Sequence, residues 1–160
     1  MDAPPTPPSH AELCRTLVAA ATSAALATLA RDPAGFPFAS LVSVAVDDQG
    51  RPILLLSNLA EHTRNLAERD QASLLFVEAA PPGTDPLAVG RVTVLGRCAR
   101  IEGADVAPAR ERFLAAHPEA ASYQAFGDFG YFRLMPETLR YVGGFGRMSW
   151  VGGEEYAAAG

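Results

Sequence analysis

The first half of the chain alternates apolar and polar positions in short runs, with turn-forming residues between the runs. This pattern predicts three strands, over residues 23–29, 38–46 and 52–56. Asp, Pro and Gly occupy the connections at 31–35 and 47–50, and these residues favour tight turns. Strands joined this closely predict an antiparallel meander rather than parallel strands with crossover helices.

Apolar positions three and four residues apart predict helices around this meander. The first covers residues 9–21 and opens with a Ser and, three positions on, a Glu, which is the spacing of a capping box. The second is capped by Ser57 or Asn58 and continues to about residue 69. A third covers residues 104–116 and ends at a His-Pro pair.

The second half of the chain adds further strand-like segments, which are 72–78, 91–102, 129–134 and 137–142. Gly96 in the middle of a long segment predicts a bulge or a barrel corner. Met135 and Pro136 join the last two segments. Together these elements predict an α+β fold, a small barrel of about six mainly antiparallel strands with flanking helices.

The length of 160 residues predicts one domain. We assign residues 10–152 to that domain. The Pro-rich residues 1–9 are predicted to be a disordered N-terminal tail, and residues 153–160 a C-terminal tail. The tail at the N-terminus lacks the basic and apolar regions of a signal peptide.

Composition narrows the classes of function. The net charge of −5 excludes a broad basic footprint, so we expect no nucleic-acid partner. The longest uncharged stretch, 16–30, is too short for a membrane-spanning helix, so we expect no membrane partner. Two cysteines without a CxxC pair fit a reducing cytoplasm. The three histidines are scattered and predict no structural metal site.

The polar segment 57–66 is the strongest candidate for a binding site. It follows the apolar run 53–56 and opens a helix, where backbone N–H groups and the helix dipole favour an anion. Arg64 can add a forked, charge-assisted hydrogen bond to a phosphate. The alternative is an ordinary capped surface helix with solvated polar residues.

The chain carries little acid–base machinery. It contains no Walker loop, no nucleophile elbow and no GxGxxG motif. His62 has no carboxylate to orient it beyond its neighbour Glu61, and the other carboxylates are scattered over turns and helix faces as solvated charges. Arg97, beside the predicted bend, is the most interesting of the strand arginines. Catalytic residues stay unknown, and an enzyme of this kind needs a cofactor to carry its chemistry.

Two motifs resemble those of a known superfamily. One is Ser57-Asn58-Leu59-Ala60-Glu61-His62-Thr63-Arg64-Asn65-Leu66, and the other is Gly143-Gly144-Phe145-Gly146-Arg147 after a strand. Both resemble the pyridoxamine 5'-phosphate oxidase-like split barrels that bind FMN. Among these, the chain looks most like the haem-utilisation branch.

This resemblance implies an FMN-binding split-barrel domain and a homodimer with its cofactor sites at the subunit interface. It also implies a flavin-dependent oxidoreductase that acts on a small-molecule substrate. The residues expected near the FMN phosphate are Ser57, Asn58, His62, Thr63 and Arg64. Those expected along the flavin ring are Ser40, Leu41 and Val42, with Arg147 approaching the ring or the substrate, from the partner subunit in one arrangement.

The chain departs from the family pattern at two places. It lacks the basic residue after the second strand and the Arg–His pair near the C-terminus, so the sequence does not predict vitamin B6 oxidation. It has no histidine after His117 to serve as the axial ligand of haem oxygenase relatives. The alternatives are a haem-binding or haem-utilisation protein without catalysis, a deazaflavin in place of FMN, and a barrel without cofactor.

Overall fold

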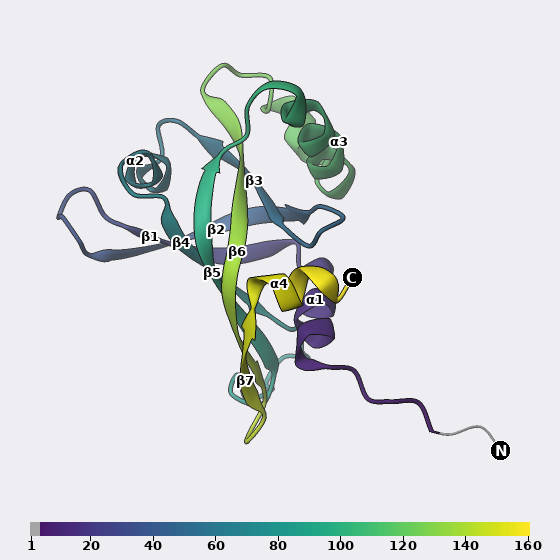
Figure 1. The fold of residues 1–160 in the computed structure, drawn as a ribbon. Helices are drawn as coiled ribbons and strands as arrows, with labels where there is room; N and C mark the ends of the chain where they lie inside the picture. Colours follow the sequence, from purple (N-terminus) through teal and green to yellow (C-terminus); the bar gives the residue numbers. More distant parts are fainter. Residues whose placement is uncertain (1–3) are drawn as a thin grey trace.

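The protein folds as a six-stranded antiparallel barrel with one additional strand and four α-helices (Figure 1). The computed structural model describes residues 4–160. The strands are β1 (Ser23–Leu29), β2 (Pro37–Val46), β3 (Pro52–Ser57), β4 (Gln71–Val77), β5 (Gly90–Arg100), β6 (Phe129–Gly143) and β7 (Met148–Gly152). The helices are α1 (His10–Ala20), α2 (Glu61–Glu68), α3 (Val106–Ala116) and α4 (Gly153–Ala158).

The strands run in the order β3-β2-β1-β4-β5-β6-β7, and a further pairing of β3 with β6 closes the barrel. The long strand β6 makes this closure possible. Along one edge, its first residues pair with β3 and its last residues pair with β7. The expected α+β barrel of about six mainly antiparallel strands is thus confirmed.

Strand β6 is continuous where the sequence predicted two strands. Leu95 pairs with Thr138, whereas Gly96 pairs with Pro136, so one residue of β6 is left out of register. A bulge tolerates proline because the ladder is already interrupted there. A Cβ at Gly96 would lie 2.0 Å from the Met135 carbonyl oxygen, so the close approach requires glycine. The predicted bend at Gly96 is therefore correct, and the predicted break is wrong.

The inward-facing positions of the strands form the main core. Leu26, Leu74, Val94 and Leu139 are fully buried there, and helix α1 adds Val18. Helix α1 begins with the expected capping box, in which Ser9 and Glu12 bond each other's backbone N–H. Burial of these side chains supplies the main driving force for the fold.

Helix α3 covers part of the outer surface of the barrel. Its Phe113 packs with Ile53 of β3 and Tyr131 of β6 in a second, smaller core. Figure 1 shows α3 on the upper right, away from α2. The remaining outer surface, over β1, β4 and the ends of β2, β6 and β7, is not part of this second core.

The two predicted tails differ from each other in the structure. Residues 153–160 are not a tail, because α4 forms there and packs beside α1. The Tyr156 side chain of α4 is only 1% exposed. The Tyr156 hydroxyl donates to the Gly50 carbonyl at 2.6 Å, which fixes this end of the chain. At the other end, residues 4–9 are exposed and outside regular structure, and residues 1–3 of the predicted tail lie outside the described residues.

Candidate cofactor-binding site

The barrel is split along one edge of β2. Strand β2 pairs with β1 over its whole length up to Ser43, but with β3 only from Val44 to Val46. Residues 37–43 of β2 therefore have strand neighbours on one edge alone. The Val44 N–H donates to Thr22 on the β1 side, and backbone direction alternates along a strand. Leu41 accordingly directs its N–H and C=O to the unpaired edge.

The three residues predicted along the flavin ring all lie on β2, but their backbone groups and side chains point in different directions. By the same alternation, Ser40 and Val42 direct their backbone groups to β1. Their side chains face inward, where Val42 is buried. The Leu41 side chain points outward and is 80% exposed. Leu41 is thus the residue of the three whose backbone and side chain are both accessible.

Helix α2 begins beside this opening, two or three residues later than predicted. Its N-cap is Ala60, which offers no side-chain cap, so the expected capping by Ser57 or Asn58 is wrong. The Ser57 Oγ instead accepts from the Leu59 N–H at 3.1 Å, in a local turn before the helix. The Thr63 hydroxyl donates to the Ser57 carbonyl at 2.6 Å and ties the helix to β3.

His62 links α2 to β2. Its Nδ1 lies 3.0 Å from the Ser40 hydroxyl, which leaves Nε2 for another partner. Burial lowers the pKa of His62 below its ordinary value, so the imidazole is neutral near pH 7. A neutral imidazole with one nitrogen fixed and the other free is the form that ligates metals. Ser40 therefore orients His62.

The first turn of α2 retains the features of an anion seat. Among residues 4–160, the backbone N–H groups of Glu61, His62 and Thr63 have no acceptor. Arg64 is half-exposed and forms a 3.2 Å ion pair with Glu61, a contact that contributes little in water. The backbone N–H groups are therefore available to an anionic group. Arg64 can exchange its ion pair with Glu61 for one with that group without a large loss of stability.

Arg100 is a residue of this region that the sequence did not single out. It donates to Asn58 and lies over the Phe132 ring at 4.8 Å from its centroid. A cavity of about 200 Å³ opens beside it, lined also by Thr63 and Cys98. The long-range register of β5 brings Arg100 here, and no local sequence signal could have indicated it.

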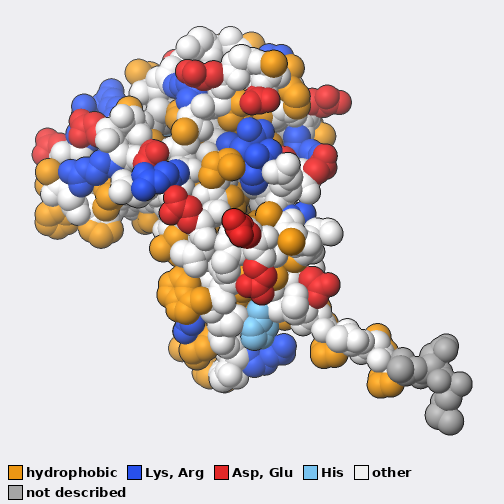
Figure 2. Space-filling view, in the orientation of Figure 1, with side chains coloured by type: hydrophobic (Ala, Val, Ile, Leu, Met, Phe, Trp, Pro, Cys, Tyr) orange, Lys and Arg blue, Asp and Glu red, His pale blue; other side chains and the backbone are white. Residues whose placement is uncertain are grey.

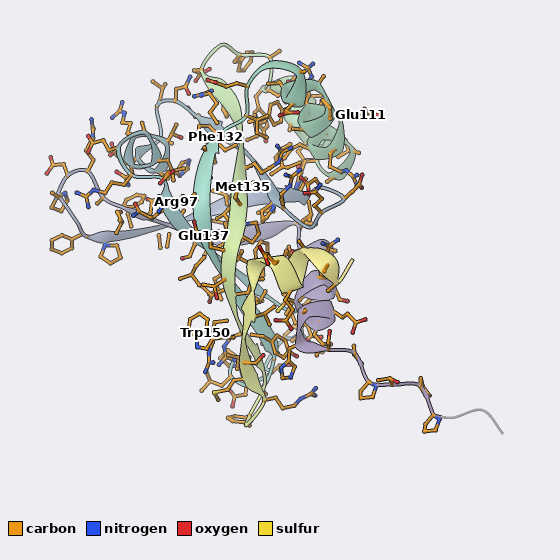
Figure 3. All side chains as sticks on the ribbon, viewed as in Figure 1. Arg97, Glu111, Phe132, Met135, Glu137 and Trp150 are labelled. Atoms are coloured by element: carbon orange, nitrogen blue, oxygen red, sulfur yellow. The ribbon has the colours of Figure 1, made fainter. Side chains whose placement is uncertain are left out.

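Arg97, by contrast, is engaged elsewhere. It bonds Asp70 at 2.7 Å and Glu137 at 3.2 Å, in a surface network across β5 and β6. Figure 3 shows Arg97 and Glu137 facing each other over these strands. Arg97, the strand arginine that the sequence marked as most interesting, is therefore held by two surface carboxylates in the structure.

Arg147 lies far from α2 within one chain. It sits in the turn between β6 and β7, where its carbonyl accepts from the Gly143 N–H at 2.7 Å. The α2 region adjoins the opposite end of β6, since Ser57 pairs with Phe129. The strand between them is roughly 45 Å long by the usual rise per residue. Arg147 therefore does not reach this site within one chain.

The outer face next to the split is apolar. One cross-strand row runs through Leu41, Ala25, Leu75, Thr93, Arg140 and Trp150. We call this set the outer row. Leu41 and Trp150 are 80% and 61% exposed, and Arg140 stacks over the Trp150 ring. Figure 2 shows hydrophobic side chains gathered on the lower left, where Figure 3 places Trp150. Exposed apolar patches of this kind mark binding surfaces.

A six-stranded antiparallel barrel that is split beside a helix start is a split-barrel fold. The chain belongs to the CREG β-barrel family, whose model matches residues 5–158. A protein of Clostridium acetobutylicum related to general stress protein 26, of the pyridoxinephosphate oxidase family, has a TM-score of 0.67 at 11% identity. The match covers 91% of this chain and 96% of that one, and it shows the fold alone.

Two other relatives are more similar in sequence. A chloroplastic heme oxygenase of Arabidopsis thaliana, HOZ, is 34% identical over 155 residues, which are 94% of this chain and 47% of the relative. A heme-binding protein of Mycobacterium smegmatis is 42% identical, with a TM-score of 0.88. That match covers 96% of this chain and 62% of the mycobacterial one.

The chain thus spans about half the length of the Arabidopsis relative and under two thirds of the mycobacterial one. The resemblance to the haem-utilisation branch of the split barrels is confirmed by these relatives. Within residues 4–160, no helix has both the length and the apolar character that a bilayer crossing requires.

Proposed function

We propose that the protein binds haem in the split beside β2, at a site that a second copy of the chain completes. The names of the two similar relatives favour haem over a flavin. The observation that carries the proposal is the position of His62, a neutral imidazole with a free Nε2 beside the open edge of β2. FMN binding, the main expectation from the sequence, becomes the second candidate.

The residues present fit haem. A flat macrocycle requires an apolar surface, and Leu41 and the exposed Leu59 supply one next to the split. The two propionates require cations, for which Arg64 and Arg100 lie on the α2 side. His62 is the candidate iron ligand, and the hydrogen bond with Ser40 orients its ring. When bound, haem supplies a redox-active iron; this chain's residues hold the propionates, orient the imidazole and exclude water.

The homodimer is part of the same proposal. The outer row leaves Leu41 and Trp150 exposed on one side of the molecule, and burial of such a surface favours association. A two-fold contact across this face is the arrangement that lets Arg147 approach the α2 region of its partner. The small-molecule substrate expected of an oxidoreductase stays a part of the second candidate.

A specific observation supports that second candidate. The unpaired N–H groups of the first turn of α2, together with Arg64, suit the dianionic phosphate of FMN. The free backbone of Leu41 suits the polar edge of a flavin ring. FMN and haem would therefore compete for overlapping surfaces of the same split.

The test is a titration of the purified full chain with haem and, separately, with FMN. Haem binding is expected to give a saturable Soret band that shifts in His62→Ala and is retained in the matched control His10→Ala. His10 lies on α1 against Tyr141, away from the split. An unchanged Soret band in His62→Ala would remove His62 as the ligand. Saturable quenching of FMN fluorescence, with no saturable haem band, would replace haem by FMN.

A further inference from the structure

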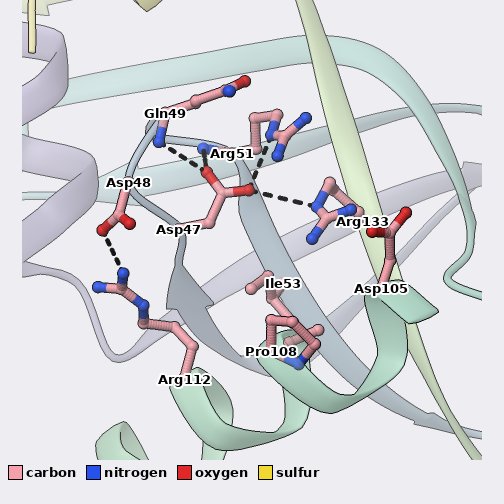
Figure 4. A pocket seen from close by; sticks show the side chains of 10 residues that line it. Asp47, Asp48, Gln49, Arg51, Ile53, Asp105, Pro108, Arg112 and Arg133 are labelled. Atoms are coloured by element: carbon pink, nitrogen blue, oxygen red, sulfur yellow. Dashed lines mark hydrogen bonds and ion pairs between the residues drawn. The ribbon is translucent and has the colours of Figure 1, made fainter.

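A second cluster of arginines lies on the α3 side of the barrel, away from the split. A hollow of about 390 Å³ lies between the β2–β3 turn, β6 and α3. Arg51 and Arg133 line it together with Asp47 (Figure 4). The sequence alone grouped Asp47 with the solvated surface charges. In the structure its side chain is only 14% exposed.

In the part of the chain that the structure describes, Asp47 is the one carboxylate that both arginines contact. Its Oδ1 accepts from the backbone N–H groups of Gln49 and Arg51, which shapes the turn. Its Oδ2 accepts from the Arg51 Nε at 2.7 Å. The Arg133 Nε lies 3.3 Å from the same oxygen, at ion-pair distance but without hydrogen-bond geometry. One carboxylate is thus shared between two arginines.

This sharing leaves an excess positive charge in a largely buried place. The Arg133 side chain is 17% exposed and that of Arg51 is 26% exposed. Arginine does not lose its proton, so the charge cannot be relieved by titration. Within the described residues, the terminal nitrogens of Arg51 and Arg133 donate no hydrogen bond. A partly buried cation of this kind is stabilised by an anion at its free donors.

Asp48 and Asp105 also line the hollow, but among residues 4–160 neither lies within ion-pair distance of Arg51 or Arg133. Asp48 pairs with Arg112, and both are exposed. Asp105, just before α3, is exposed and forms no ion pair among residues 4–160. Pro108 of α3 is the exposed apolar residue that lines the hollow. Figure 4 shows the Arg112–Asp48 pair across the hollow from Arg133.

The geometry points to a second ligand site, in which Arg133 and Arg51 bind the phosphate or carboxylate group of a small molecule and Pro108 contacts its apolar part. Planar guanidinium groups bind such oxyanions through two parallel hydrogen bonds. The site is separate from the split, because it is built from β3, β6 and α3 rather than from α2 and the open edge of β2.

The test is an NMR titration of the isotope-labelled full chain with inorganic phosphate, with succinate and with chloride at matched ionic strength. Phosphate or succinate is expected to shift the backbone amides of Gln49, Arg51 and Asp105 in a saturable way. Chloride is expected to leave them in place. Comparison of the saturable shifts with phosphate and with succinate shows which of the two oxyanions the site binds. Equal shifts with chloride, or no saturable shift with either oxyanion, would overturn the proposal.

Two variants localise the effect. Arg133→Gln is expected to weaken binding about tenfold, the scale of a lost hydrogen bond to a charged group. Arg64→Gln, the matched control beside the split, is expected to leave the shifts at Arg51 unchanged. Should Arg133→Gln fold poorly, Arg133→Lys keeps the charge, loses the fork and is expected to bind less tightly than the natural chain.

Asp105 supplies the remaining check. If its carboxylate served as the internal counter-ion of Arg133, the natural chain would not bind the oxyanions and Asp105→Asn would create binding. That result contradicts the proposal. Binding in both chains, at similar or tighter affinity in Asp105→Asn, supports it.

Discussion

Two parts of the barrel's outer surface carry apolar side chains, but they differ in what covers them. Over β3 and the start of β6, helix α3 buries Ile53 and Tyr131 to 1% and 6% exposure. Along the outer row, Leu41 and Trp150 are 80% and 61% exposed, and α3 does not reach them. The chain thus covers one apolar area with its own helix and leaves the other open.

This difference separates a structural surface from a binding surface. An antiparallel sheet with one solvated face normally presents polar residues there. Apolar residues on the outer face therefore indicate a cover, which α3 supplies on one side. We propose that a second copy of the chain and a cofactor supply it on the other. The split in β2 lies at the edge of the open part, where backbone groups are also available.

The largest expected effect falls on the covered part. Phe113→Ala removes a side chain that is 1% exposed and packs against Ile53 and Tyr131. It should lower the free energy of unfolding by about 3–5 kcal/mol. Urea denaturation followed by circular dichroism measures this. A loss below about 1 kcal/mol would show that α3 does not hold the second core.

The next largest effect is expected from a variant that weakens association through the outer row without destabilising the fold. Leu41→Asp is expected to change monomer stability by at most about 0.5 kcal/mol, because the side chain is exposed. A carboxylate buried at a two-fold contact costs several kcal/mol, so the dimer dissociation constant should rise about a hundredfold or more. Analytical ultracentrifugation measures the shift.

A matched control for this variant is Leu87→Asp. Leu87 is similarly exposed, at 56%, but lies in the loop between β4 and β5 and outside the outer row. It should leave the assembly unchanged. Equal weakening by both variants would mean that added negative charge, and not the outer row, controls association.

A smaller effect concerns the cation beside the split. Arg64→Ala should weaken cofactor binding by about 1.5–3 kcal/mol, the range for a hydrogen bond to a charged group. Its control is Arg69→Ala, an exposed arginine just after α2. Isothermal titration calorimetry gives both affinities. The same affinity in Arg64→Ala and in the natural chain would remove Arg64 from the site.

The smallest effect is a pH dependence. Burial lowers the pKa of His62, so the unfolded chain binds a proton at a higher pH than the folded chain does. The stability that neutral His62 contributes is therefore present above about pH 6.5 and is lost as the pH falls through the folded pKa. His62→Gln lacks this loss. Urea unfolding of both chains at about pH 8 and pH 5.5 should show a larger acid destabilisation in the natural chain.

The parts of the fold that could be predicted are those with a local signal in the sequence. The capping box depends on Ser9 and Glu12, three residues apart, and the bend in β5 is marked by Gly96 itself. The start of α2 was misplaced because Ser57 bonds within its own turn instead of capping the helix. Helix α4 was missed because its order depends on the distant contact between Tyr156 and Gly50.

Some residues of the candidate site could likewise be predicted from the sequence, and others could not. The helix start with Thr63 and Arg64 carries a motif, and the structure places it beside the opening of β2. The register of β5 against β4 and β6 places Arg100 in this region and Arg97 outside it. That register follows from the packing of the whole barrel and has no signal within a short window of sequence.

The most direct test of the central claim is a haem titration of the natural chain followed by its absorbance spectrum and its mass in solution. We predict a saturable Soret band at one haem per chain, carried by a dimer. The same titration of Leu41→Asp should give a monomer with a weakened band. A natural chain that shows no saturable Soret band, or an equally strong one in a monomeric Leu41→Asp, would contradict a haem site completed by a second copy.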